Sequence, residues 1–155
     1  MILYLGIDPG KGGAAALVDA NGVLEGLCNF DKVGMHGFYE WLEVWAMCER
    51  IHGLMERVGA RAPGQCSMQT MFKLGEAYGK AQAYTQALGV PLEFVEPRKW
   101  QKAYTRGHKP RDYNDRKKIL HQAAKRLYPR DKFLKPEADA LLIAHYAASL
   151  RMRPI

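Results

Sequence analysis

ILYLGIDPG, residues 2–10, is an apolar run that ends in a carboxylate and then in a proline–glycine turn. A buried strand needs aliphatic residues without internal breakers, and Pro and Gly are typical of the point where the chain leaves it. We therefore predict a buried strand over residues 2–7. Asp8 is expected at the end of that strand, where solvent, a metal ion or a substrate can reach its carboxylate.

Two further short strands follow closely. AAALV, residues 14–18, is apolar throughout, and VLEGLCNF, residues 23–30, comes after a turn that holds Asp19, Asn21 and Gly22. Short strands joined by tight turns are typical of antiparallel pairing. The first thirty residues thus predict an antiparallel meander.

An acid at this strand end has three interpretations. It is a metal ligand in ribonuclease H-like nucleases, and it belongs to a phosphate-binding hairpin in proteins of the actin and sugar-kinase type. It is also a common turn-forming or helix-capping side chain beside Pro and Gly. The motif alone leaves all three open.

The length of the chain bears on this choice. At 155 residues we expect a single domain over residues 1–155, too small for the two-domain clamp that closes around ATP. We therefore expect no nucleotide cofactor. Residues 2–7 are too few for a membrane span or a signal peptide, so a cytosolic protein without membrane contact is expected. Cys28, Cys48 and Cys66 form no CxxC pair, which argues against a disulfide frame or a zinc site.

Charge is distributed unevenly along the chain. Residues 1–97 hold 7 Lys and Arg against 11 Asp and Glu, whereas residues 98–155 hold 16 against 5. Lys and Arg displace the counterions of a phosphate backbone. A basic half beside an acidic strand end favours a nucleic acid held against metal-binding carboxylates.

Periodicity and turn residues predict the remaining elements. A strand over residues 52–58 carries Glu56, and a last helix starts at Pro136 with Glu137 and Asp139 in its first turn. Gly75 and Gly79 lie four apart in a helix, where each costs about 1 kcal/mol, so close packing against a sheet or a twin helix is expected there. The other expected elements are helices over 36–50, 69–88 and 114–127, a strand over 91–97, and a basic loop over 105–118.

Asp8, Glu56 and Asp139 fall on three separate elements. The order of strands and helices is similar to that of the ribonuclease H-like fold, in which a first-strand acid, a fourth-strand acid and a final-helix acid converge. We therefore expect an α/β fold with a mixed five-stranded sheet, three antiparallel and then parallel strands, and helices on both faces. Clustered carboxylates repel one another and persist where a divalent cation neutralises them. Hard oxygen ligands favour Mg²⁺, with Mn²⁺ able to substitute.

The chain resembles the Holliday junction resolvases of the RuvC family, and in particular its compact phage-type members. The motifs that carry the resemblance span nearly the whole chain in the order of the family. They are GIDPG (6–10), MERV (55–58), KLGEAYG (73–79), VEPRKWQK (95–102) and ADALLIA (138–144).

This resemblance implies a homodimeric, structure-selective endonuclease, in the host cytoplasm if phage-encoded, that nicks two opposed strands of a four-way DNA junction. It also implies that Asp8, Glu56 and Asp139 bind Mg²⁺ and that the nicks carry 5′-phosphate and 3′-hydroxyl ends. The implied DNA contacts are Lys11, Arg57, Arg61, Lys73, Arg98, Lys99, Lys109, Arg111, Lys117 and Lys118.

Two positions depart from the family. The family has an acid or a histidine three residues before its last aspartate, where this chain has Pro136; Glu137 is the nearest substitute. Residues two apart on a helix differ by about 200° in direction, so Glu137 and Asp139 share one ion only if the helix begins irregularly. Just after Glu56 the bacterial enzymes carry an aromatic wedge, where this chain has Gly59. Met68, Met71 and Phe72 are candidates to replace it.

Two other functions stay open at this point. One is a broader nuclease of the same fold, acting on branched or flap DNA or on an RNA–DNA hybrid. The other is a catalytically weak protein that binds DNA structures, which the missing acid at Pro136 brings into consideration. An ATP-binding protein ranks last.

Overall fold

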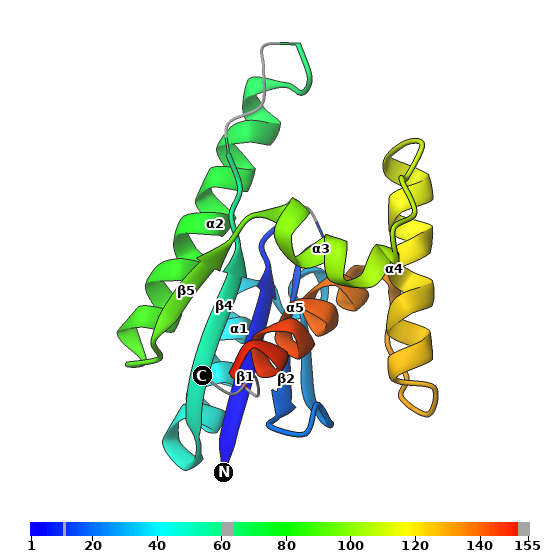
Figure 1. Cartoon of the computed structure of the whole chain (residues 1–155). Coiled ribbons are helices and arrows are strands. Elements are labelled where there is room, and N and C mark those ends of the chain that lie inside the picture. The colour runs from blue at the N-terminus through cyan, green and yellow to red at the C-terminus, as the bar shows by residue number, and fades with distance from the viewer. Residues whose placement is uncertain (11, 60–63, 152–155) are drawn as a thin grey trace.

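Five strands form one mixed sheet with the order β3-β2-β1-β4-β5 (Figure 1). The computed structural model describes residues 1–10, 12–59 and 64–151. The strands are β1 (Ile2–Asp8), β2 (Ala14–Asp19), β3 (Leu24–Asn29), β4 (Arg50–Glu56) and β5 (Leu92–Val95).

The pairing of the strands confirms the predicted sheet. β1 pairs antiparallel with β2, and β2 pairs antiparallel with β3. β4 then lies parallel to β1 on its other side, and β5 lies parallel to β4. Tight turns allow the first three strands to pair in sequence, whereas parallel pairing requires the crossover helices that follow β3 and β4.

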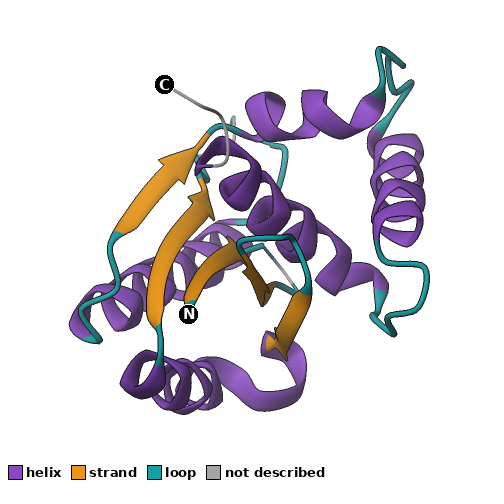
Figure 2. Ribbon diagram, turned by 60° about the horizontal axis from the view of Figure 1, so that its bottom comes forward, coloured by secondary structure: helices purple, strands orange, loops and turns teal. Residues whose placement is uncertain are grey.

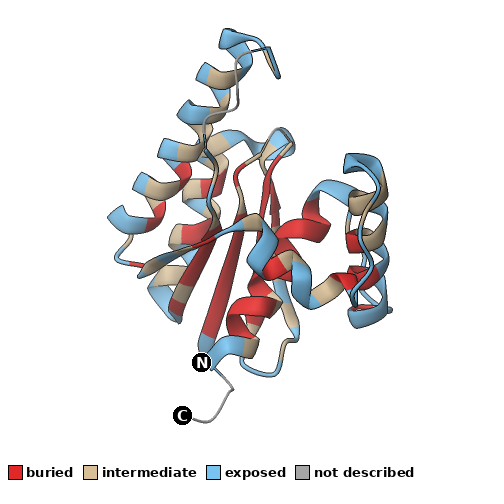
Figure 3. Ribbon diagram, turned by 45° about the horizontal axis from the view of Figure 1, so that its top comes forward, coloured by how far each residue is buried: buried red, intermediate tan, exposed pale blue. Residues whose placement is uncertain are grey.

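Helices cover both faces of the sheet, as predicted (Figure 2). One core joins β1 and β2 to Phe38 and Leu42 of α1 and to Ala81 of α2; the other joins them to α5 and to Trp100 and Leu120. Figure 3 shows the buried residues running along the central strands and through α5. The helices are α1 (Phe30–Cys48), α2 (Met68–Ala87), α3 (Pro97–Thr105), α4 (Tyr113–Leu127) and α5 (Lys135–Arg151).

The two ends of α1 and the presence of α3 are the main differences from the sequence prediction, and the bounds of β4 and β5 also shift by up to two residues. α1 begins at Phe30 rather than at His36, because Asn29 ends β3 and its side chain accepts a hydrogen bond from the Asp31 amide at 3.0 Å. Gly34, with φ 69°, interrupts the helical backbone of α1. The residues before it therefore do not continue the periodic apolar pattern that predicts the rest of the helix. α1 ends at Cys48, so residue 50 is wrong as part of that helix and begins β4 instead. The third difference is α3, a short helix that the pattern after β5 does not predict.

Gly6 is the point at which α5 meets β1. A Cβ atom at Gly6 would lie 2.2 Å from the Ala144 amide nitrogen and 2.3 Å from the Ala140 carbonyl oxygen. The helix backbone therefore rests directly on the strand backbone, which is possible only because glycine has no side chain. This contact sets the position of the start of α5, and hence of Asp139, relative to the end of β1.

The two glycines of α2 have a different environment. Nothing lies within 4 Å of a Cβ atom built at Gly75 or Gly79, and both residues are exposed. The described part of the chain therefore offers no sheet or helix that packs closely on them. The N-terminal end of α2 projects past the edge of the sheet (Figure 1). None of the described helices is both long enough and apolar enough to span a membrane.

Candidate active site

Three carboxylates lie at one edge of the sheet. Asp8 ends β1, and Glu56 ends the neighbouring strand β4, one residue beyond the register pair Ile7–Met55. Parallel strands carry their carboxyl ends to the same edge, so both side chains lie there. Asp139, in the buried first turns of α5, is the third. The tertiary structure thus brings together Asp8, Glu56 and Asp139, which we call the carboxylate cluster.

The electrostatics of the cluster show that its members act on one another. Burial raises the pKa of Asp8 to about 6, and the Asp139 carboxylate adds to this increase, while Lys117 and the Gly10 amide oppose it. Burial likewise raises the pKa of Glu56 to about 7, and the charge of Asp8 raises it further. Each negative charge makes the next one harder to form, which is the signature of carboxylates that share a site.

Two donors support the cluster, the buried Trp100 of α3 and the half-buried Lys117 of α4. Trp100 is fully buried and donates its Nε1–H to Glu56 Oε2 at 2.7 Å. The Lys117 ammonium contacts Asp139 Oδ2. Burial disfavours the charge of Lys117, but the carboxylates of Asp139 and Asp8 outweigh it and raise the pKa of this lysine. Lys117 therefore supplies a positive charge to the cluster.

The donor atoms of the cluster fit a hard divalent cation. All three are carboxylates, the class of ligand that Mg²⁺ prefers, and their mutual repulsion is what a bound cation relieves. Among the described residues, no three His, Cys, Asp or Glu side chains are already gathered tightly enough to form a metal site. A cation would thus have to draw these carboxylates together, in competition with Lys117 at Asp139.

Glu137 lies apart from the cluster. One of its carboxylate oxygens accepts a hydrogen bond from the Leu134 amide at 2.6 Å, and the other accepts from Asn29 Nδ2 at 3.3 Å. The side chain therefore caps the first turn of α5 and ties it to the end of β3. The structure does not bring Glu137 together with Asp8 and Glu56, in agreement with the 200° argument from helix geometry.

The predicted DNA contacts that the structure describes lie on several surfaces. Arg98 and Lys99 are exposed on α3, and Lys118 is exposed on α4. Lys109 is exposed in the loop between these helices, and Lys73 is exposed on α2. They are exposed cations, available to phosphates.

Two other predicted contacts already have partners. Arg57 pairs with Glu96 at 3.2 Å and stacks on Phe94, and Arg111 pairs with Asp115 at 3.4 Å. Lys117, a third predicted DNA contact, pairs with Asp139. Lys11 and Arg61 lie outside the described residues.

Comparison with solved structures gives a match over nearly the whole chain. The structure of T. thermophilus RuvC in complex with Holliday junction substrate aligns with a TM-score of 0.69 and 18% identity, over 98% of this chain and 96% of the other. A second structure of Thermus thermophilus RuvC aligns with a TM-score of 0.61 and 20% identity, over 97% and 96%. This chain has the RuvC fold.

The RuvC fold confirms the sequence resemblance at the level of architecture, including the ribonuclease H-like sheet and its strand order. No protein-family model matches the sequence, and no curated protein does. The three-dimensional structure therefore carries the likeness, and the five short motifs given above are its trace in the sequence.

Sequence reasoning missed the supports of the cluster. Trp100, which belongs to the VEPRKWQK motif, lies in the core with its indole N–H on Glu56. The signal that could have found it is a tryptophan one turn into a segment after Pro97, because a buried indole N–H needs an acceptor. Lys117 was predicted to bind phosphate, and its contact with Asp139 has no counterpart in sequence spacing.

The raised pKa values of the cluster predict a specific pH dependence. Asp8 and Glu56 have pKa values of about 6 and about 7 in the folded protein, above the ordinary values of 3.8 and 4.5. Between these limits the folded state holds more protons than the unfolded state, so its stability falls as pH rises. Without divalent cations we expect a loss of about 1 to 3 kcal/mol from pH ~4 to ~8, after allowance for solvent screening.

Urea unfolding in the presence of EDTA at several pH values measures this loss. Asp8→Asn is expected to flatten the profile. It removes one titrating carboxyl group, and it also removes the negative charge that raises the pKa of Glu56. A profile that rises over the same window would show that the carboxylates do not repel one another in the folded protein.

Proposed function

We propose that this protein is a metal-dependent endonuclease that resolves four-way DNA junctions. The observation that carries the proposal is the carboxylate cluster at the strand ends of a RuvC fold, formed by Asp8, Glu56 and Asp139. A neighbour of the same fold is solved with a Holliday junction substrate. The uneven charge of the chain, basic after residue 97, supports a nucleic-acid ligand.

The cluster residues have defined tasks in this proposal. Asp8, Glu56 and Asp139 would hold Mg²⁺, or Mn²⁺ in its place, through their carboxylate oxygens. A cation there supplies Lewis-acid chemistry that activates water and stabilises the leaving 3′ oxygen of a phosphodiester. The products would carry 5′-phosphate and 3′-hydroxyl ends. Trp100 would orient Glu56 through its hydrogen bond, and Lys117, beside Asp139, would offer positive charge to a phosphate.

A panel of DNA substrates tests the proposal. Labelled four-way junction, flap, RNA–DNA hybrid and linear duplex are incubated with the protein, with Mg²⁺ or with chelator. Paired symmetric nicks on the junction alone, lost in chelator, are the expected result. Cutting of every branched form would instead identify a broader nuclease of the same fold.

The second candidate is a catalytically weak protein that binds branched DNA. Two observations favour it. Asp139 is already paired with Lys117, and Glu137 already accepts hydrogen bonds from Asn29 and Leu134, so few free carboxylate oxygens remain to bind a cation. In the same panel it would shift the junction on a gel without cutting it at any Mg²⁺ concentration.

The proposal also includes a homodimer, because two symmetric cuts need two sites related by a two-fold axis. A stripe along α2 is suited to this role. Met68 and Phe72 are 89% and 74% exposed, and Gly75 and Gly79 continue the same helical face at spacings of four, three and four. In an antiparallel pair of α2 helices, Phe72 of one copy would lie over Gly79 of the other. The stripe is thus complementary to itself.

A leucine at Gly79 is expected to break this dimer. The chain has open space at this Cβ, so Gly79→Leu leaves the monomer folded and improves its helix propensity. In the dimer, the new leucine side chain of each copy would overlap with Phe72 of the other copy. The overlap occurs twice because of the two-fold symmetry, and it should weaken association by about 100-fold. Sedimentation equilibrium measures the change.

Ala87→Leu is the matched control, since residue 87 is exposed on α2 but lies off the stripe. Dimerisation that survives Gly79→Leu unchanged would place the dimer surface elsewhere. A monomeric variant that still binds the junction should make unpaired single nicks.

A further inference from the structure

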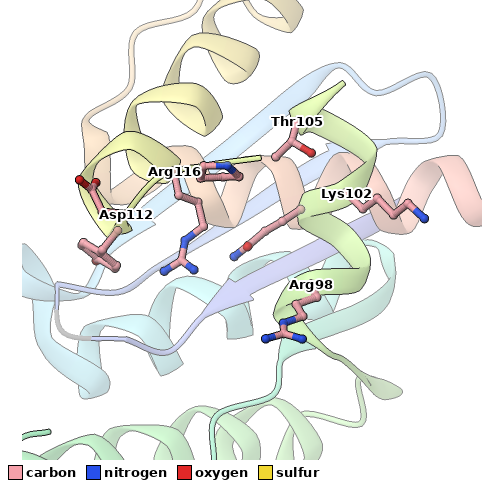
Figure 4. Close-up of a pocket in the computed structure, with 8 residues that line it drawn as sticks. Arg98, Lys102, Thr105, Asp112 and Arg116 are labelled. Atoms are coloured by element: carbon pink, nitrogen blue, oxygen red, sulfur yellow. The ribbon is translucent and has the colours of Figure 1, made fainter. Parts of the chain in front are cut away.

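A groove of about 450 Å³ lies between α3 and α4, beside the carboxylate cluster but distinct from it. Arg98, Gln101, Lys102 and Thr105 line it from α3, and Tyr113 and Arg116 line it from the start of α4. Figure 4 shows the guanidinium groups of Arg98 and Arg116 directed toward the same open side, although they come from different helices. Two planar donors converge there.

Both guanidinium groups are available to a ligand. Within residues 1–10, 12–59 and 64–151, neither Arg98 nor Arg116 forms an ion pair with a carboxylate. The one acid in the lining, Asp112, caps α4 by accepting a hydrogen bond from the Asp115 amide at 2.8 Å. Figure 4 shows its carboxylate turned away from the two arginines. The open side of the groove therefore carries positive charge and planar forks that match phosphate.

The groove also contains an exposed aromatic ring. Tyr113 is 59% exposed, and the Arg116 guanidinium carbon lies 5.2 Å from the centre of its ring. The Lys117 ammonium, which contacts Asp139, lies 5.7 Å from the same ring. Tyr113 thus connects the groove to the cluster. An exposed aromatic surface beside phosphate-binding cations is the combination that binds single-stranded nucleic acid.

We propose that the α3–α4 groove binds an unpaired nucleotide of the strand that the carboxylate cluster engages, with its phosphate on Arg98 and Arg116 and its base on Tyr113. This inference rests on the proposed function. It extends that function by naming the site that holds a base once the base has left the duplex. Opening of base pairs at a branch point would supply such a nucleotide.

Arginine variants test the phosphate part of the groove. Binding of a fluorescent single-stranded oligonucleotide and of a four-way junction is measured in EDTA at several salt concentrations. Arg98→Ala and Arg116→Ala should each weaken single-strand binding and lower the salt slope by about 0.7, the value for one lost phosphate contact on a single strand. Lys102→Ala is the matched control, because Lys102 also lines the groove from α3 but its ammonium points away from both arginines (Figure 4).

Tyrosine variants test the base part. Tyr113→Ala should weaken single-strand binding by about 5-fold or more, whereas Tyr113→Phe should bind as the original protein does, since stacking needs only the ring. The same two variants measured on linear duplex should be indistinguishable, because paired bases do not reach the ring.

The outcomes separate this proposal from the proposed function. Junction cutting that is unaffected by Arg98→Ala, Arg116→Ala and Tyr113→Ala, with single-strand binding no weaker than in Lys102→Ala, would overturn the groove while leaving the nuclease intact. A protein that never cuts the junction, yet loses single-strand binding in the arginine variants, would overturn the nuclease and support the groove.

Discussion

An Asp8→Asn variant is expected to bind a four-way junction as the original protein does and to cut it about 10³-fold more slowly or worse. Asparagine has the shape of aspartate and can still accept the hydrogen bond from the Gly10 amide, which lies 3.1 Å from Asp8 Oδ1. What it removes is one negative charge from a cluster of three. A bound cation would then lose a ligand, while the exposed Lys and Arg side chains proposed to bind phosphates stay in place.

The same variant is expected to be more stable than the original protein when no cation is present. Burial and Asp139 raise the pKa of Asp8, so its charge is unfavourable in the folded state at neutral pH. A gain in stability together with a loss of cutting is hard to obtain from damage to the fold. It is the pattern of a residue whose charge serves function at the expense of stability.

Cleavage and gel-shift assays on the same junction measure the first effect, and urea unfolding measures the second. Asp19→Asn is the matched control: its carboxylate accepts backbone hydrogen bonds from Asn21 and Val23 in the β2–β3 turn, outside the cluster. Cutting that survives Asp8→Asn would remove Asp8 from the mechanism.

The second large effect is expected at Gly6. Gly6→Ala would place a carbon 2.2 Å from the Ala144 nitrogen and 2.3 Å from the Ala140 oxygen, and both are backbone atoms that cannot turn aside. α5 must then move off β1, which opens the core on that face. We expect a loss of about 3 to 5 kcal/mol in the free energy of unfolding, at the upper end of single substitutions.

Activity should fall with stability in this variant, because the shift of α5 carries Asp139 away from Asp8. Gly59→Ala is the control, since none of the described residues lies within 4 Å of a Cβ atom there and its effect should stay within about 0.5 kcal/mol. Thermal unfolding compares the two. Equal stability of the two variants would mean that α5 does not rest on β1 as the structure has it.

Much of the fold followed from local patterns. Five strands and four of the five helices were predicted within a few residues, because apolar runs, caps and turn residues are local signals. α3 was missed because nine residues make only about two and a half helical turns, and the polar Arg98, Lys99, Gln101 and Lys102 surround its buried Trp100. The early start of α1 was missed because Gly34 breaks the periodic pattern.

By itself, the sequence determined which acids stand at element ends: Asp8 after an apolar run, Glu56 after another, and Asp139 in an alanine-rich helix. Only the tertiary structure decided that these three affect one another's charge and that Glu137 does not join them. It also placed Trp100 and Lys117 against the cluster. The physical reason is that carboxylate repulsion and hydrogen bonding depend on distance in space, and that distance is set by parallel strand pairing and by the contact of α5 with Gly6.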